Sequence, residues 1–367
     1  MEKIRLLIID DSALIRTMLT KIFESSEAIE VVGTAADPII ARDKIKKLKP
    51  DVLTLDIEMP RMDGLTFLRN LMRLRPMPVV MISTLTEKGA EVTLEALAIG
   101  AVDFVVKPKV DVANTLHAYA EDLIEKVKAA AKANIRSESN PVSHQKHSMQ
   151  AADMTAKLSA DAVIQAAAPK KHFTTTEKII ALGSSTGGTE AVKTVVKGLP
   201  RTTPAIVIAQ HLPIAFSASF AKHVDEVTEM QACVAEEGQV IRPGHIYIAP
   251  GDKHLLVVRN GARYVCQLND GPPVNRHKPS VDVMFRSVAQ NVGANAIGVM
   301  LTGMGADGAI AMKEMRDAGA INIIQDEASS VVWGMPSEAY RQGAAHYVQP
   351  LEQVAAQILA LVKKSGN

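Results

Sequence analysis

The chain has 367 residues, enough for about two domains of ordinary size, and its 41 Lys and Arg nearly balance its 40 Asp and Glu. This balance gives no overall electrostatic signature of nucleic-acid or anionic-membrane binding, and two cysteines exclude a disulfide framework. No apolar run reaches the roughly 18 residues of a membrane-spanning helix, so we expect a cytoplasmic protein with no nucleic-acid partner and no membrane insertion.

Residues 1–126 alternate between short apolar runs and segments with helical periodicity. The expected strands are 4–9, 30–35, 51–56, 78–83 and 103–107. Apolar strands separated by amphipathic helices are typical of a parallel sheet covered by helices on both faces. The sequence therefore predicts an N-terminal α/β domain of the doubly wound, flavodoxin-like class.

Acidic residues lie at the ends of two of these strands. Asp10 and Asp11 follow the first strand and Asp56 closes the third, while Thr84 and Lys107 lie at the ends of the fourth and fifth. The carboxyl ends of parallel strands meet at one edge of a sheet, and carboxylates that crowd together favour a cation such as Mg²⁺. Each carboxylate alone is also compatible with a helix cap, most of all Asp11.

The motifs DDSALIR, LDIEMPRMDG, STLT and VDFVVKP resemble the response-regulator receiver family over the whole first domain. The resemblance implies that Asp56 accepts a phosphoryl group from a histidine kinase. It also implies that Asp10, Asp11 and Asp56 hold the Mg²⁺ that this reaction needs. Thr84 and Lys107 would then sense the phosphoryl group.

Residues 127–176 differ in character, being rich in Ala, Ser, Lys and Gln and without a strand signal. We interpret them as a linker, partly helical through ADMTAKLSADAVIQAAA.

The α/β alternation resumes over residues 177–367. The expected strands are 178–183, 204–210, 245–250, 254–259, 262–268, 295–301, 321–326 and 346–350. The turn signal Pro-Gly-Asp at 250–252 predicts a hairpin between the strands on either side of it. We expect a Rossmann-like, mostly parallel sheet with an antiparallel hairpin insertion.

The stretch GSSTGG at 183–188 joins a strand to a helix and satisfies G-x-S-x-G with Ser185 at its centre. Small flanking residues allow a tight turn that exposes a nucleophilic hydroxyl at the sheet edge. The free N–H groups of the next helix would face an oxyanion. The same stretch is equally compatible with a glycine loop that binds phosphate or a nucleotide.

A nucleophilic serine needs a base and a carboxylate that orients the base. His211 directly follows the strand 204–210, and Asp307 lies in the loop after the strand 295–301, so both are expected at the same edge as Ser185. His277, in the loop PPVNRHKPS, is a weaker rival for the base. The chain order Ser, His, Asp differs from that of α/β-hydrolases, which argues against that fold but not against the chemistry.

The motifs IALGSSTGGTEAV, AQHLP, IAPGDKHL, DGPPVNRHKPSVDVMF and GVMLTGMGADGA resemble the catalytic domain of chemotaxis protein-glutamate methylesterases, from about residue 178 to 360. The resemblance implies that Ser185 is the nucleophile, His211 the base and Asp307 the orienting acid. It places the oxyanion hole at the Met304 backbone N–H and around Thr186.

With a receiver domain in front, the resemblance implies a phosphorylation-activated serine hydrolase. Its substrates would be glutamate methyl esters on chemotaxis receptors, and some members of the family also deamidate glutamine. Ester hydrolysis by such a site needs no cofactor.

Two other functions stay open on the sequence alone. One is a response regulator with a DNA-binding output domain, which the near-neutral charge and the absence of a helix-turn-helix pattern disfavour. The other is a nucleotide-binding module built on GSSTGG. It lacks the acidic residue about 20 positions further on, because the next strand ends in Gln210 and His211.

Overall fold

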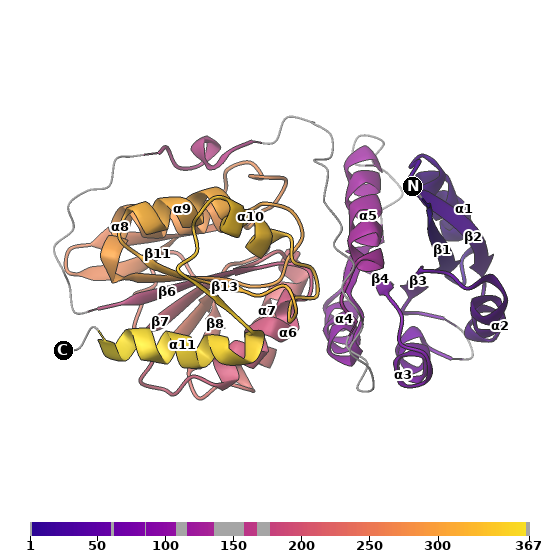
Figure 1. The fold of residues 1–367 in the computed structure, drawn as a ribbon, viewed down its shortest axis with the longest axis horizontal. Coiled ribbons are helices and arrows are strands. Elements are labelled where there is room, and N and C mark those ends of the chain that lie inside the picture. The colour runs from indigo at the N-terminus through magenta and orange to yellow at the C-terminus, as the bar shows by residue number, and fades with distance from the viewer. Residues whose placement is uncertain are drawn as a thin grey trace.

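The computed structural model describes residues 2–59, 62–84, 86–107, 116–135, 158–166 and 177–364. These residues form two α/β units, which lie side by side along the longest axis of the molecule (Figure 1). The first lies N-terminal to residue 136 and the second begins with residue 177.

The N-terminal unit is a five-stranded parallel sheet with helices on both faces. Its strand order, β2-β1-β3-β4-β5, is that of flavodoxin-like folds, which confirms the predicted class. The strands are β1 (Ile4–Ile9), β2 (Ile29–Ala35), β3 (Val52–Asp56), β4 (Val79–Ser83) and β5 (Asp103–Val106). The helices are α1 (Ala13–Glu24), α2 (Pro38–Leu48), α3 (Gly64–Leu74), α4 (Glu87–Ile99) and α5 (Leu116–Ala131).

Polar residues between strands and helices fix where the first four helices begin. Ser12, Asp37, Asp63 and Thr86 each accept a hydrogen bond from a backbone N–H of the first helical turn. Such N-caps satisfy donors that have no partner within the helix. The cap of α1 is therefore Ser12, which leaves both preceding aspartates at the sheet edge.

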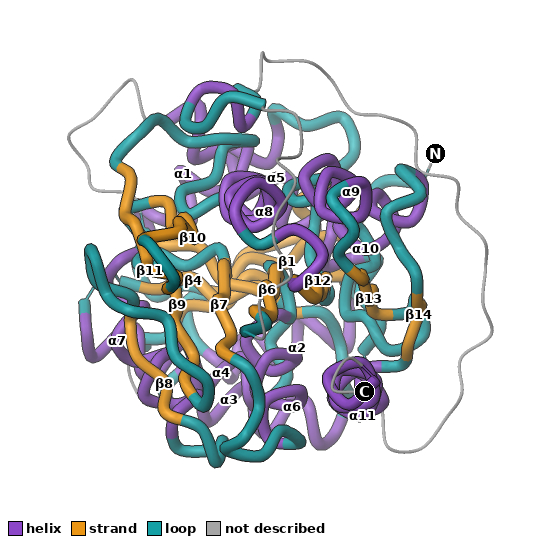
Figure 2. Tube along the Cα trace, turned by 90° about the vertical axis from the view of Figure 1, so that its left-hand side faces the viewer, coloured by secondary structure: helices purple, strands orange, loops and turns teal. Residues whose placement is uncertain are grey.

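The C-terminal unit is a seven-stranded sheet in the order β14-β13-β12-β6-β7-β9-β8, with every pair parallel. Helices α8, α9 and α10 cover one face, and α6, α7 and α11 cover the other (Figures 1 and 2). The strands are β6 (Ile179–Ser184), β7 (Ala205–Gln210), β8 (Gln231–Val234), β9 (His245–Ile248), β12 (Ala296–Met300), β13 (Ile321–Gln325) and β14 (Tyr347–Gln349). The helices are α6 (Gly188–Lys197), α7 (Ile214–Asp225), α8 (Val281–Asn291), α9 (Ala309–Asp317), α10 (Met335–Arg341) and α11 (Leu351–Lys364).

The prediction of a hairpin at residues 250–252 is wrong. The strand before this turn, β9, belongs to the main sheet, where it pairs in parallel with β7 and β8. The antiparallel pair is formed instead by β10 (His254–Asn260) and β11 (Arg263–Asn269), in a separate two-stranded sheet. Gly261 and Ala262 make this turn, because Asn260 pairs with Arg263, and Gly261 at φ 61 holds the first loop position, where type II′ hairpins place glycine.

Helices α6 and α7 of the C-terminal unit pack against the N-terminal unit. Helix α4 lies against α6 and α7, and the rings of Phe104 on β5 and Phe216 on α7 stack with centroids 4.5 Å apart. Buried apolar residues of both units form one continuous cluster. The interface is therefore a packed extension of both cores.

Of the stretch interpreted as a linker, the structure describes residues 127–135 and 158–166. The helix α5 continues to Ala131, and Ala160–Ala162 form a 3₁₀ turn rather than part of a longer helix. The remainder of the segment predicted as partly helical lies outside the described residues.

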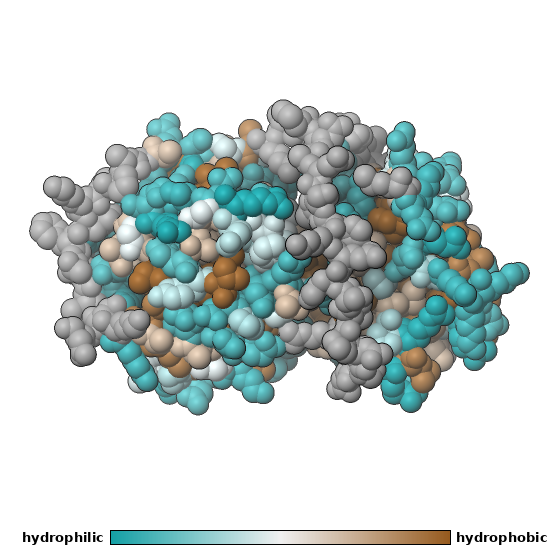
Figure 3. Space-filling model, in the orientation of Figure 1, coloured by the Kyte–Doolittle hydropathy of each residue, from teal (hydrophilic) through white to brown (hydrophobic). Residues whose placement is uncertain are grey.

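None of the described helices combines the length and the apolar character that crossing a membrane requires. In the face shown in Figure 3, hydrophilic side chains dominate the coloured surface, and apolar ones occur in small scattered groups.

Candidate functional sites

The three residues predicted to form a hydrolase site lie together at the carboxyl edge of the C-terminal sheet. The Ser185 Oγ lies 3.1 Å from His211 Nδ1, and His211 Nε2 lies 2.8 Å from Asp307 Oδ2. With the Nε2-protonated tautomer, His211 donates to Asp307 and accepts from the Ser185 hydroxyl. This series of serine, imidazole and carboxylate can activate a serine nucleophile, with the two ring nitrogens in exchanged roles relative to the Ser-His-Asp template.

The strand order explains why these residues meet. Strand β6 has β7 on one side and β12 on the other, and the helices that follow β7 and β12 cover opposite faces of the sheet. Loops that follow strands on the two sides of such a switch point run in opposite directions, so ligands commonly bind at the ends of these strands. Ser185 follows β6, His211 follows β7 and Asp307 lies in the loop after β12.

Glycines allow the tight turn that carries Ser185. Gly187 has φ 75, and an added Cβ there would lie 2.7 Å from the Val331 side chain. An added Cβ at Gly188 would lie 2.2 Å from the Gln210 amide oxygen. The turn therefore needs both a left-handed backbone and close approach, which only glycine provides.

Asp307 is held by an unusually complete set of hydrogen bonds. Its Oδ2 accepts from His211 and from the Val281 N–H at 2.7 Å. Its Oδ1 accepts from the Ser280 hydroxyl at 2.7 Å, the Asn275 amide at 2.8 Å and the Asp282 N–H at 3.3 Å. Burial alone raises a carboxyl pKa, but His211 and these donors outweigh it and hold the pKa of Asp307 well below its usual range.

A second buried carboxyl lies beside Asp307. Asp282 accepts from Asn275 Nδ2 at 2.7 Å and from the Ala311 N–H at 2.9 Å. Burial, and then the neighbouring Asp307 charge, raise the pKa of Asp282 to about 7. The two carboxyls share one amide, so their protonation states are linked.

Sequence reasoning missed Asn275 and ranked His277 only as a rival base. The His277 ring stacks on the His211 ring, with centroids 3.7 Å apart and planes 11° from parallel, so it lies beside the predicted base. Both residues lie in the loop between β11 and α8, which does not leave a carboxyl end of the main sheet. The one available signal was the position of this loop immediately before the helix that starts at Val281.

The residues predicted for the oxyanion hole lie next to Ser185. An added Cβ at Gly303, the residue before Met304, would lie 3.0 Å from the Ser185 Cβ. The Ser185 N–H itself donates to the Thr302 carbonyl at 3.0 Å, so it is not available to an oxyanion. The Thr186 hydroxyl donates to Asp103 Oδ2 of the N-terminal unit at 2.5 Å.

The acidic residues of the N-terminal unit also converge. Carboxylate oxygens of Asp10, Asp11 and Asp56 lie within 4.8 Å of one another. Asp10 and Asp56 are buried, and among the described residues the Oδ2 atom of each faces only the Lys107 ammonium. Buried, incompletely satisfied carboxylates of this kind fit a hard cation such as Mg²⁺.

Lys107 supplies the positive charge at this edge. Its Nζ lies 2.8 Å from Asp56 Oδ2 and 3.4 Å from Asp10 Oδ2, and Thr84 follows the end of β4 next to β3. Burial raises the pKa of Asp56 to about 6, with a further increase from Asp10, although Lys107 opposes the change. The single Lys107 charge therefore does not offset the burial of the two carboxylates.

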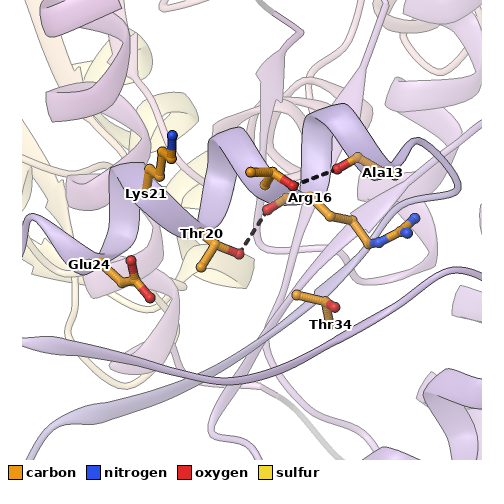
Figure 4. Close-up of a pocket in the computed structure, with 7 residues that line it drawn as sticks. Ala13, Arg16, Thr20, Lys21, Glu24 and Thr34 are labelled. Carbon is orange, nitrogen blue, oxygen red and sulfur yellow. Dashed lines mark hydrogen bonds between the residues drawn. The ribbon is translucent and has the colours of Figure 1, made fainter.

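A separate hollow of about 480 Å³ lies along α1 (Figure 4). Its polar groups are mostly satisfied locally, since Thr17 and Thr20 donate to the Ala13 and Arg16 carbonyls. The Arg16 guanidinium donates to the Asp10 and Asp11 carbonyls, so it orders the chain before α1. We assign the hollow no chemistry of its own.

Comparison with known proteins gives concordant matches. The family model described as CheB methylesterase matches residues 180–358, and the one described as response regulator receiver domain matches residues 6–121. A protein-glutamate methylesterase/protein-glutamine glutaminase of Hydrogenovibrio crunogenus is 56% identical over 99% of this chain and 100% of its own length. One of Geobacter metallireducens is 51% identical over 100% of this chain and 98% of its own.

A solved structure gives the same result for the C-terminal unit. The CheB methylesterase catalytic domain of Thermotoga maritima is 34% identical and covers 50% of this chain and 98% of its own, with a TM-score of 0.50.

Proposed function

Because this chain belongs to the CheB methylesterase family, we propose that it removes methyl groups from glutamate methyl esters of chemotaxis receptors and deamidates receptor glutamines. A receiver domain (residues 1–126), a linker (127–176) and a catalytic domain (177–367) divide the work. The observation that carries the proposal is the hydrogen-bonded series Ser185, His211 and Asp307, at 3.1 and 2.8 Å.

The chemistry begins with proton transfer from Ser185 Oγ to His211 Nδ1 as the oxygen attacks the ester carbonyl. Asp307 keeps the Nε2–H directed away from the serine and stabilises the imidazolium that forms. The Met304 backbone N–H and the groups around Thr186 are assigned to the oxyanion.

Collapse of the tetrahedral intermediate releases methanol, which takes the proton from His211. Water then attacks the acyl-enzyme with His211 as base, which yields the free glutamate and restores Ser185. A glutamine side chain follows the same path with ammonia as the leaving group. The reaction uses no group beyond the chain and water.

The receiver is assigned to control access to this site. Its β5 and α5 lie over the catalytic edge, where Asp103 accepts from Thr186 and Glu121 pairs with Arg276 at 3.1 Å. Phosphoryl transfer from a histidine kinase to Asp56, sensed by Thr84 and Lys107, is proposed to loosen this interface. Asp10, Asp11 and Asp56 would hold Mg²⁺, which supplies charge neutralisation when bound.

Methanol release from methylated receptor membranes tests the proposal, with and without a small-molecule phosphoryl donor. Wild type should release methanol faster with the donor, and Ser185→Ala should release none under either condition. The matched control is Ser184→Ala, because Ser184 is the adjacent serine but bonds only the Gln210 side chain among described partners. Methanol release by Ser185→Ala would refute the nucleophile, and equal rates with and without donor would refute the switch.

The assignment also locates the chain in the cytoplasm, with the receptors as substrates and the kinase as phosphoryl donor.

A further inference from the structure

The loop between β11 and α8 contains two residues in a conformation that side chains rarely adopt. Asn275 has φ 52 and Arg276 has φ 72, and only one other non-glycine residue among those described has positive φ. Such conformations persist where surrounding contacts enforce them, and they are frequent at functional sites. The contacts of the Asn275 side chain show which groups this backbone conformation positions.

The Asn275 carboxamide donates both of its hydrogens to buried carboxyl groups. Its Nδ2 lies 2.8 Å from Asp307 Oδ1 and 2.7 Å from Asp282 Oδ2. A primary amide is the neutral side-chain group that donates two hydrogen bonds from one atom. Asn275 therefore separates two carboxyls that would otherwise repel each other when ionised.

We propose that Asn275 is a positioning residue for the triad and that residues 158–165 of the linker hold it in place. This inference rests on the proposed function, since it concerns the same hydrolytic site. Asn275 binds the oxygen of Asp307 that His211 does not use. It thus fixes the plane of the carboxylate and directs Oδ2 toward the His211 ring.

The linker reaches Asn275 through the backbone. The Asn275 N–H donates to the Leu158 carbonyl at 2.9 Å. The neighbouring Ala160 is buried in a small apolar cluster with Leu256, Val274 and Val283. The residue on either side of the Asn275–Arg276 pair is thereby tied down, since Val274 belongs to this cluster and His277 stacks on His211.

An ion pair anchors the same linker segment to the catalytic domain. The buried Arg286 guanidinium on α8 donates to Asp161 at 2.8 Å and to the Ile164 carbonyl at 3.1 Å. It also donates to Glu314 on α9 at 2.7 Å. Residues 158–165 are therefore part of the catalytic unit and not only a tether to the receiver.

Two substitutions at Asn275 separate positioning from a backbone role. Asn275→Gly keeps the left-handed backbone and removes both hydrogen bonds, and Asn275→Asp keeps the shape but replaces two donors with a third carboxylate. With phosphoryl donor and methylated receptors, we expect kcat to fall about 10- to 100-fold for Asn275→Gly with unchanged KM. The kcat of Asn275→Asp should be lower still, because the added negative charge repels Asp307.

A purely conformational role predicts a different order. Glycine and aspartate both tolerate positive φ, so both variants would then keep wild-type kcat. Wild-type kcat in Asn275→Gly would overturn the inference, even if Asn275→Asp failed to fold. Lys49→Gly is the matched control, since Lys49 has φ 49 but lies in the receiver at the end of α2.

The proposed role of residues 158–165 is tested in the full chain with Ala160→Asp. This substitution places a charge in the apolar cluster and should release these residues from the catalytic domain. We expect a fall in kcat no larger than that of Asn275→Gly, and no further fall when the two are combined. Full activity of Ala160→Asp would overturn the role of the linker. Methanol release by wild type but not by Ser185→Ala, measured in parallel, keeps these outcomes separate from failure of the proposed function.

Discussion

Each of the two sheets has a buried carboxylate at its carboxyl edge, Asp307 in one and Asp56 in the other, and the two carboxylates differ in how fully they are hydrogen-bonded. Asp307 at the catalytic edge accepts hydrogen bonds from three side chains and two backbone N–H groups. Asp56 at the receiver edge has the Lys107 ammonium and one long hydrogen bond, 3.4 Å from the Glu58 N–H. Catalysis needs one fixed geometry, whereas a switch needs charge that an incoming group can neutralise.

The pKa directions express the same contrast. The contacts of Asp307 lower its pKa, while burial raises the pKa of Asp56 to about 6. An ionised carboxylate therefore stabilises the fold at the catalytic edge and destabilises it at the receiver edge near neutral pH. Substitutions of Asp307 and Asp56 should therefore change the stability of the fold in opposite directions and by different amounts.

The largest effect is expected from the base itself. His211→Ala should lower methanol release by about 10⁴- to 10⁶-fold, because among the described residues His211 is the base at bonding distance from the Ser185 hydroxyl. His245→Ala is the control, since His245 opens β9 at the opposite end of the sheet and bonds the Pro243 carbonyl. A loss below tenfold in His211→Ala would assign the base to His277 instead.

Asp307→Asn should lower the rate by about 10⁴-fold and also destabilise the catalytic domain by about 1–3 kcal/mol at pH 7. The amide cannot accept from all of the donors that face the carboxylate. Because the folded-state pKa is lowered, this contribution is present at neutral pH and disappears as the pH falls through the folded-state value. Scanning calorimetry at pH 7 measures the stability, and unchanged stability would contradict the hydrogen-bond assignment.

Asp56→Asn should abolish stimulation by the phosphoryl donor and leave basal activity intact. Without Mg²⁺ it should stabilise the receiver by about 2 kcal/mol at pH 7, because it removes a carboxylate whose ionisation the fold opposes. The raised folded-state pKa means that this penalty grows between pH 4 and 6, so wild type and variant should have similar stability at pH 4. Lower stability of Asp56→Asn than of wild type at pH 7 would contradict the claim that ionised Asp56 destabilises the receiver.

Asp103→Ala tests the contact between the receiver and the catalytic domain at Thr186. Removing the acceptor of the Thr186 hydroxyl should weaken the closed arrangement and raise basal methanol release about tenfold, with little change in the donor-stimulated rate. Donor-stimulated activity of the same sample is the internal control for folding. A drop in both rates would mean that Asp103 supports the receiver fold and not the interface.

The smallest effect belongs to the exposed pair between the domains. Glu121→Gln breaks the contact with Arg276, whose side chain is 40% exposed, and should raise basal turnover at most about fivefold. The increase should shrink at high salt, since screening already weakens such pairs.

The sequence predicted the strands that carry chemistry because their signals are local. Apolar runs ending in Asp10, Asp56 or His211 gave both the sheet and the edge at which these residues meet. Strand β8, Gln231–Val234, was not predicted, since it is short and partly exposed on the edge of the sheet.

Features that depend on packing between distant segments were beyond local reasoning. The strand β9 continues the main sheet through the Ala249 N–H, which donates to the Ile208 carbonyl of β7, and no local signal reports that contact. The role of Asn275 likewise depends on Asp307 and Asp282 arriving from other elements. The hydroxyl of Thr186 points to Asp103, 83 positions earlier in the chain.

That last hydrogen bond has a thermodynamic consequence. On the proposed mechanism, the receiver and a receptor glutamate compete for the same loop, so a receptor that binds at Ser185 displaces Asp103. By reciprocity, receptor occupancy then favours the released receiver by the same factor that release favours receptor binding. Receptor-bound enzyme should therefore be a better acceptor of phosphate than free enzyme, which makes the substrate a participant in its own regulation.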